Sequence, residues 1–194
     1  ALGTNDFAPY IQSILDSGAE GVWVALAGRD AVNFAQQADQ FGLLDEVKVA
    51  GVSFVTDNTV RTLGDVSEGI YGIINYSSTL DTPENTAFVE AWAQKYPDSW
   101  PANFEGDTYV GMQLLFAAIE HAGSSEPAAI AEAMEGLTVN TIVGEVTVRP
   151  EDNQAVRGNF FGQVLAQDGT LRPVISMEVA SDVAMAEPNP ECRY

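Results

Sequence analysis

The sequence contains little of the chemistry on which enzymes and metal proteins depend. Among its 194 residues there is one histidine, His121, and one cysteine, Cys192. A zinc site needs several such ligands, and a serine triad needs a histidine together with a G-x-S-x-G elbow, which is absent. His121 stands in the last turn of an expected helix, where an imidazole complements the helix dipole. The sequence therefore disfavours an enzyme and predicts no metal site.

Basic residues are also scarce. Eight lysines and arginines face 28 aspartates and glutamates, which gives a net charge of −20 and a pI near 4.1. This balance opposes binding to nucleic-acid phosphates and to anionic lipid surfaces. The acidic residues are scattered, as on solvated faces. No stretch reaches the ~18 apolar residues that a membrane helix needs, so we expect no direct membrane insertion.

The glycines and the paired carboxylates have structural interpretations. Gly18-Ala19-Glu20-Gly21 precedes an expected strand, whereas a dinucleotide-binding fingerprint follows one, so we predict no cofactor. Glu105 and Asp107 stand beside the expected start of a helix and are interpreted as capping residues.

The first residue of the sequence and the cysteine near its other end each lead to an expectation. The sequence starts at Ala1 rather than at a methionine, and we expect processing or cleavage to account for this start. Near the other end, Cys192 fits two cases. In an exported protein a lone cysteine suggests a disulfide partner in sequence that is missing here, and in the cytoplasm it is a reduced thiol.

The segment Gly21–Gly51 is typical of a complete strand, helix and strand. Val22–Leu26 is a short apolar run, Asp30 is a plausible N-cap, and Gly42 follows the last residue of the helical apolar pattern. A second apolar strand spans residues 47–52. Strands joined in this way lie parallel with a right-handed crossover, and ligands bind beyond their carboxyl ends. Here those ends are Ala27-Gly28-Arg29 and Val52-Ser53-Phe54.

The alternation of helices and strands continues through much of the chain and predicts an α/β fold. Further helices are expected at about residues 9–17, 57–63, 84–96, 107–122 and 126–135, and further strands at 69–74, 144–148, 159–166 and 171–179. A hairpin turn is expected at 167–170, and the polar segment Asn75–Pro83 reads as a crossover or hinge. The tail after Ala180 lacks any periodicity and is expected at the surface.

The motifs, in their order, resemble the second half of the periplasmic substrate-binding proteins of ABC importers. The subgroup is the branched-chain amino-acid (leucine/isoleucine/valine) and amide-binding type. The resemblance covers nearly all of residues 1–179, and its motifs are GTNDFAPYIQSILDSGAEGVWV, GRDAVNFAQQADQFGL, VAGVSF, DVSEGIYGIINY, AFVEAWAQKYPDSWPANFEGDTYVGMQLLFAAIEHAGS and NTIVGEVTV with the hairpin after it.

The resemblance implies a three-layer αβα lobe of the type I periplasmic-binding-protein fold, with a parallel sheet, plus an incomplete part of its partner lobe. Residues 1–76 would form the second lobe and 77–158 part of the first lobe. Residues 159–180 would form a hinge crossing and a returning β-hairpin, and 181–194 a tail. The N-terminal half of the family fold, which supplies groups that grip a ligand carboxylate, is absent. A ligand would be enclosed between the lobes.

The resemblance also implies a ligand site without catalytic residues. Its lining would include Ala27, Gly28, Ser53, Phe54 and Phe104. Amino-acid binders carry a carboxylate for the ligand ammonium where this chain has Ser53, so the charge pair for an α-amino group is missing. Two structural interpretations stay open: Ser53 as an ordinary turn residue, and Phe104 as a loop aromatic packed on Trp100.

The expected function is therefore a periplasmic, soluble solute-binding component of an ABC transporter. It would bind an amino-acid-like molecule, an amide or a small carboxylate and deliver it to the membrane permease. The alternatives are a ligand-sensing domain of a receptor or regulator and an enzyme on a flavodoxin-like sheet.

The absent half has a consequence for the helices after Thr79. Their apolar faces, such as Met112, Leu115 and Phe116, would lack cover. We therefore expect a proteolytic remnant, a companion chain or an oligomer, and Cys192 would pair with a cysteine of the absent half.

Overall fold

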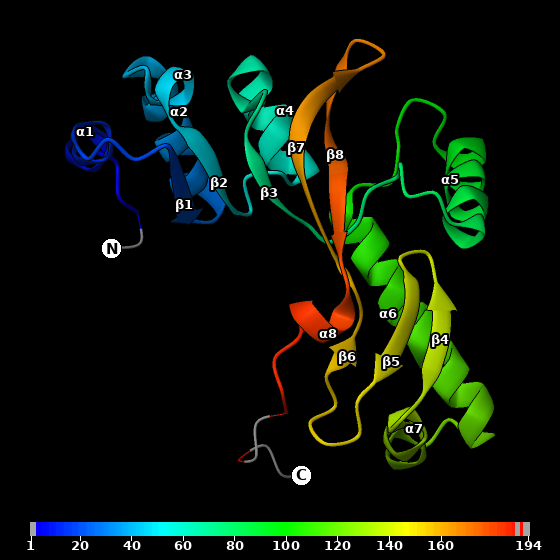
Figure 1. Ribbon diagram of the computed structural model, residues 1–194. Helices are drawn as coiled ribbons and strands as arrows, with labels where there is room; N and C mark the ends of the chain where they lie inside the picture. The colour runs from blue at the N-terminus through cyan, green and yellow to red at the C-terminus, as the bar shows by residue number, and fades with distance from the viewer. Residues whose placement is uncertain (1–2, 189–190, 192–194) are drawn as a thin grey trace. The chain divides into compact units, whose positions relative to one another are not determined.

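The computed structural model describes residues 3–188 and Glu191, and Figure 1 shows its helices and strands. The chain divides into two units: unit 1 comprises Ala1–Ile74 and Phe160–Met177, and unit 2 comprises Asn75–Asn159 and Glu178–Tyr194. The fold is α/β, as the alternation of elements predicts. Cys192 lies outside the described residues, so its expected disulfide stays a prediction.

Unit 1 is an alternating series of helices and strands followed by a hairpin. Its helical segments are α1 (Ala8–Asp16), α2 (Gly28–Gln40), α3 (Leu43–Glu46), α4 (Asp57–Leu63) and the 3-10 helix η1 (Gly64–Ser67). Its strands are β1 (Gly21–Ala25), β2 (Lys48–Val52), β3 (Tyr71–Ile74), β7 (Asn159–Gln167) and β8 (Thr170–Val179). The sheet order is β1-β2-β3-β7-β8; β1, β2 and β3 are parallel, and β7 is antiparallel to β3.

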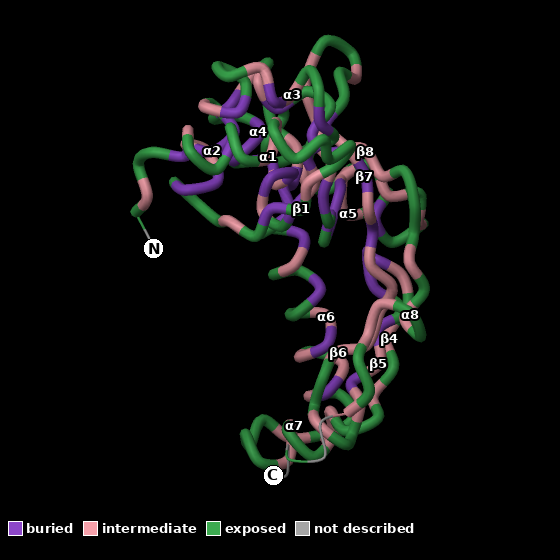
Figure 2. Tube along the Cα trace, turned by 60° about the vertical axis from the view of Figure 1, so that its left-hand side comes forward, coloured by how far each residue is buried: buried purple, intermediate pink, exposed green. Residues whose placement is uncertain are grey.

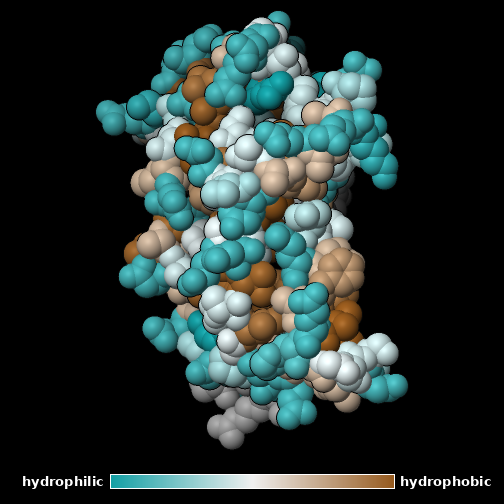
Figure 3. All heavy atoms as spheres, turned by 90° about the vertical axis from the view of Figure 1, so that its right-hand side faces the viewer, coloured by the Kyte–Doolittle hydropathy of each residue, from teal (hydrophilic) through white to brown (hydrophobic). Residues whose placement is uncertain are grey.

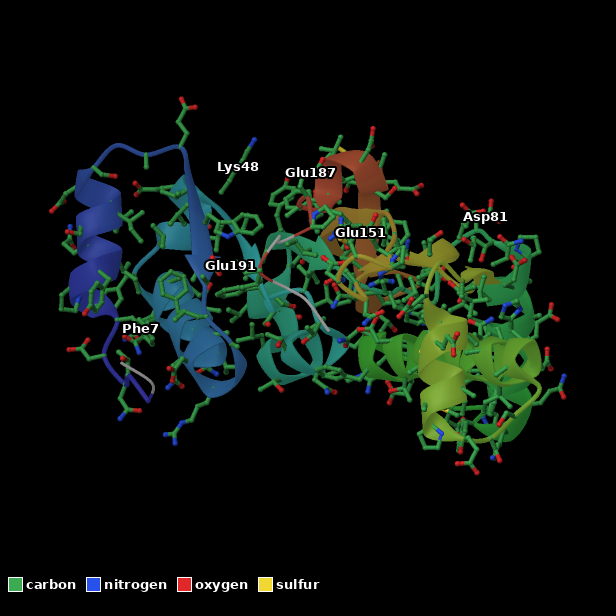
Figure 4. All side chains as sticks on the ribbon, turned by 90° about the horizontal axis from the view of Figure 1, so that it is seen from below. Phe7, Lys48, Asp81, Glu151, Glu187 and Glu191 are labelled. Carbon is green, nitrogen blue, oxygen red and sulfur yellow. The ribbon has the colours of Figure 1, made fainter. Side chains whose placement is uncertain are left out.

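The core of unit 1 lies between its helices and one face of this sheet. Helix α2 contributes buried residues at helical spacing, and the strands contribute every second residue, including Val24 and Val49. Phe7, labelled in Figure 4 at the start of α1, packs edge-on against Phe34 with the ring centroids 5.6 Å apart. Gly42 has a φ of 75°, so the left-handed residue expected after α2 is confirmed.

Two helix starts differ from the sequence-based expectation. Helix α2 begins after Ala27, and Asp30 is not its cap but a buried first-turn residue whose carboxylate accepts a hydrogen bond from the Gly3 N–H at 3.0 Å. Helix α6 (Asn103–Ala122) begins four residues before Asp107. Asp107 therefore lies inside the helix and does not cap it. Its side chain has a partner elsewhere in unit 2. Glu105 stays in the first turn, where a carboxylate complements the dipole.

Unit 2 combines helices with a small antiparallel sheet. Its other helices are α5 (Pro83–Lys95), α7 (Pro127–Met134) and α8 (Ser181–Ala184), and its strands are β4 (Thr138–Thr141), β5 (Gly144–Val148) and β6 (Ala155–Val156). β4 was not expected, because TVNT is short and polar; it forms by pairing with β5. Figure 2 shows α7 without buried residues. His121 lies in the last turn of α6, as predicted.

Candidate functional site

The carboxyl edge of the parallel strands brings three predicted site residues together. β1 and β2 pair with Ala25 opposite Val52, so Ala27-Gly28 and Ser53 leave the sheet next to each other. Ala27 and Gly28 are exposed, and Ser53 is half-buried. This edge is where open parallel sheets bind ligands.

Ser53 has a left-handed backbone, with a φ of 64°. For a residue other than glycine this conformation costs on the order of 1–3 kcal/mol and persists only where the surroundings fix it. The first turn of α4 fixes it here, because the Thr59 hydroxyl donates a hydrogen bond to the Ser53 carbonyl oxygen at 2.9 Å. The Thr56 hydroxyl oxygen lies 2.9 Å from that of Thr59 and completes the chain of hydrogen bonds.

A row of glycines lets the segment after Ser53 fold back onto the sheet. Gly51 pairs with Gly72 and Gly72 with Gly162 across neighbouring strands. A Cβ on Gly51 would lie 3.0 Å from Cδ2 of Phe54, and one on Gly72 would lie 2.9 Å from Cγ2 of Val55. The missing side chains therefore leave the space that these two residues fill.

Phe54 lies in the core rather than at the exposed edge. Its side chain is fully buried, and its ring packs edge-on against Phe34 with the centroids 6.1 Å apart. Of the two residues after β2, Ser53 alone is left to face outward. Phe54 instead supports the Ser53 turn from inside.

The start of α2 favours an anionic group at the same edge. Ala27, the N-cap, makes no side-chain hydrogen bond to the first-turn N–H groups. Those groups carry the positive end of the helix dipole, which stabilises carboxylates and phosphates. The exposed Arg29 adds a positive charge, and the Asp30 carboxylate of the same turn is buried against the Gly3 N–H.

Replacing Thr59 with valine should loosen the Ser53 turn. The variant keeps the side-chain shape but loses the hydrogen bond to the Ser53 carbonyl oxygen, so we expect a loss of about 1 kcal/mol in the free energy of unfolding. Urea denaturation measures it. Thr62→Val, which removes an exposed hydroxyl bonded to Asn58 within α4, is the matched control and should change stability by less than ~0.5 kcal/mol. Equal effects of the two substitutions would contradict the assignment.

Phe104 lies in unit 2, as the second residue of α6, with 60% of its surface exposed. It borders a hollow of about 470 Å³ whose other lining residues are Phe88, Trp92, Glu105, Thr108, Tyr109 and Met112. Further along α6, Met112 and Phe116 are exposed and Leu115 is half-buried. The face of the molecule in Figure 3 likewise shows apolar atoms among the polar ones. The expected uncovered apolar face is therefore present on α6.

A second hollow, of about 760 Å³, lies at the opposite edge of the unit 1 sheet. It is lined where β1, β2 and β3 begin, and its charged side chains include Glu20, Lys48 and Glu68. Parallel sheets bind ligands at their carboxyl ends, so we do not assign the site to this hollow.

An ion pair in unit 2 joins α6 to the segment before β7. Nη2 of Arg157 lies 3.6 Å from Oδ1 of Asp107, which also interacts with the Asn75 side chain. Burial raises the pKa of Asp107, although Arg157 and Asn75 act in the opposite direction. Burial likewise lowers the pKa of Arg157 against the attraction of Asp107. Desolvation thus outweighs the attraction at both groups. No local pattern in the sequence indicates a pair 50 residues apart.

Residues 3–188 and Glu191 contain neither a cluster of metal ligands nor a candidate membrane span. No group of histidine, cysteine or acidic side chains there is placed to hold a metal ion. No helix in the same part of the chain is both long enough and apolar enough to cross a membrane.

Comparison with solved structures relates this fold to transport proteins. An ABC transporter substrate-binding protein from Sphaerobacter thermophilus superposes with a TM-score of 0.83 at 24% identity, covering 93% of this chain and 50% of that one. A solute-binding protein of an ABC transporter from Rhodopseudomonas palustris, solved with p-hydroxybenzoic acid, has a TM-score of 0.78 at 28% identity. That match covers 95% of this chain and 52% of the other.

Sequence comparison identifies the family. Leu/Ile/Val-binding protein homolog 6 of Brucella melitensis is 30% identical over 179 residues, which cover 87% of this chain and 45% of that protein. The chain thus spans about half the length of the curated relatives that it matches. The profile described as periplasmic binding protein matches residues 1–170. The chain belongs to the periplasmic binding protein family, whose members are solute-binding proteins and not enzymes.

Proposed function

We propose that this chain is about half of the solute-binding component of an ABC transporter, located in the periplasm. The whole protein would capture a small organic molecule and deliver it to the membrane permease. Family membership over residues 1–170 and the transport proteins among the structural neighbours support this function. The observation that most directly supports this function is the strained backbone of Ser53, which lies at the carboxyl edge of the sheet beside the uncapped start of α2.

The proposed ligand is a small carboxylate without an ammonium group, and an aromatic acid is the first candidate. Relatives point to two classes: Leu/Ile/Val-binding homologues at 30% identity, and Rhodopseudomonas palustris proteins solved with 4-hydroxybenzoate and p-hydroxybenzoic acid at 27% and 28%. An α-amino group needs a carboxylate partner, and Ser53 offers a hydroxyl instead. The positive end of α2 suits a carboxylate. These features favour the second class.

Each proposed site residue has a role. The backbone N–H groups after Ala27 and Gly28, together with the Ser53 hydroxyl, would donate hydrogen bonds to the ligand. Phe54 would hold the Ser53 turn in place from the core, and contact between Phe104 and the ligand stays a prediction from the sequence.

Thermal unfolding of the full-length protein tests the ligand class. The panel contains amino acids, amides, small aliphatic carboxylates and aromatic acids. A ligand at 100 times its dissociation constant should stabilise the protein by about 2.7 kcal/mol. We expect stabilisation by an aromatic acid. Stabilisation by amino acids alone would overturn the ligand class but keep the binding function, and no stabilisation by any compound would count against the binding function.

Ser53 variants separate binding from backbone strain. Ser53→Ala should weaken ligand binding about tenfold, because a hydrogen bond to a charged group contributes about 1.5 kcal/mol. Ser53→Gly should weaken binding similarly but raise stability by about 1 kcal/mol, because glycine adopts a left-handed backbone without strain. Isothermal titration and urea denaturation measure the two effects. Ser13→Ala, at an exposed position of α1, is the control, and unchanged affinity in both Ser53 variants would remove Ser53 from the site.

A further inference from the structure

The chain passes between unit 1 and unit 2 three times. On the unit 2 side, the residues next to these passages are 75–76, 157–159 and 178–179, and we call them the first, second and third crossing ends. A Cβ on Gly158 would lie 3.1 Å from Oε1 of Glu178 and 3.2 Å from the carbonyl oxygen of Val179. The second and third crossing ends therefore pack directly against each other.

The first crossing end is anchored in the interior of unit 2. The Tyr76 ring lies so close to Gly106 of α6 that a Cβ on this glycine has no room. The Tyr76 hydroxyl donates a hydrogen bond to Oδ1 of the buried Asn85, on α5, at 2.9 Å. Helices α5 and α6 thus hold the first crossing end in place by packing and by one buried hydrogen bond.

Asp107, the next residue of α6, joins the second crossing end to this anchor. Its carboxylate lies 3.6 Å from Nη2 of Arg157 and also interacts with the Asn75 side chain, so one side chain contacts two crossing ends. The Arg157 and Asp107 side chains are 15% and 33% exposed, and partly buried charges are screened less than surface charges. Nη1 of Arg157 is buried and has no hydrogen-bond partner within the described residues, so the guanidinium relies on Asp107 to balance its charge.

We propose that the Asp107–Arg157 pair is a positioning contact for ligand binding, which holds the first and second crossing ends in a fixed arrangement and so raises the affinity without touching the ligand. This inference rests on the proposed function, in which two lobes enclose a small molecule. Crossing ends that are fixed in advance need not be ordered when the ligand binds, and such ordering lowers affinity. The pair suits this role because it restrains segments that are far apart in the sequence.

Isothermal titration of the full-length protein with 4-hydroxybenzoate tests the proposal. The double variant Asp107→Leu, Arg157→Met should recover most of the stability that Asp107→Leu alone loses, yet bind about fivefold more weakly than the natural protein. The two results together separate positioning from stability. Asp152→Leu, which breaks the Arg149–Asp152 pair of the turn between β5 and β6, is the matched control and should leave the affinity unchanged. Natural affinity in the double variant would overturn the proposal.

Hydrogen exchange of the full-length protein without ligand gives a second test. Amides of residues 155–160 should exchange about fivefold faster in the double variant, because local opening there no longer separates an ion pair. Amides of β1 are the internal control and should exchange equally in both proteins. Equal exchange at residues 155–160 would overturn this inference alone. A natural protein that binds no carboxylate would overturn the proposed function, and this inference with it.

Discussion

Replacing Gly51 with alanine should destabilise unit 1 by about 3 kcal/mol, near the upper end for overpacked cores. The new Cβ would lie 2.1 Å from the Val24 carbonyl oxygen and 3.0 Å from the Phe54 ring. The carbonyl belongs to the paired neighbouring strand and has no room to move without breaking the ladder. The midpoint of urea denaturation, followed by circular dichroism, measures the effect.

Gly111→Ala provides the contrasting control. Gly111 lies within α6, and an added Cβ would meet no atom within 4 Å. This substitution should stabilise unit 2 by about 0.5–1 kcal/mol, because alanine loses less conformational freedom in a helix than glycine does. If Gly51→Ala left the midpoint unchanged, the close approach of β1, β2 and Phe54 described here would be incorrect.

In the Asp107–Arg157 pair, the double substitution should cost less stability than the single one. Removing one partner, as in Asp107→Leu, leaves the other charge in a desolvated position. We expect a loss of about 1–3 kcal/mol, discounted because the Asp107 side chain is 33% exposed. Asp107→Leu combined with Arg157→Met should recover most of that loss, because the double variant removes both desolvation costs. A double-mutant cycle by urea denaturation measures the coupling.

The pH dependence of stability gives the same pair a second readout. Burial raises the pKa of Asp107 above the ordinary value of an aspartate, so the protonated form is favoured in the folded state. Its contribution to stability is complete below the unfolded pKa and is lost as the pH rises through the folded pKa. Relative to Asp107→Asn, the natural protein should therefore lose stability as the pH rises from the ordinary titration range of an aspartate through the raised pKa of Asp107. A difference that grows in the opposite direction would contradict this sign, and Asp98→Asn, an exposed carboxylate, is the control.

Much of the fold follows from local patterns in the sequence. The apolar run before Ala27, the helical spacing up to Gly42 and the next apolar strand sufficed to predict a parallel strand-helix-strand unit. The dipeptide Asp168-Gly169 likewise predicted the hairpin between β7 and β8. In the structure these two residues have φ values of 49° and 76°. Such features depend on neighbouring residues, so their side-chain periodicity and backbone preferences can be recognised from the sequence alone.

The candidate site was predictable in position but not in detail. The carboxyl ends of β1 and β2 identify Ala27, Gly28 and Ser53, because parallel strands place those ends at one edge. The role of Thr59 in the site is only weakly indicated by the sequence, through a Thr-x-x-Thr pattern at the start of a helix. That Phe54 turns inward depends on the empty space above Gly51, which becomes visible once the strand register is known.

The sequence by itself determined the order of most of the elements, the α/β class and the edge at which a ligand is expected. Only the tertiary structure decided the backbone of Ser53, the pairing of Asp107 with Arg157 and the exposure of Trp23 on the unit 1 sheet. The physical reason is the same in each case. Periodicity and turn preference are local properties, whereas strain, desolvation and cover depend on which distant residues packing brings together.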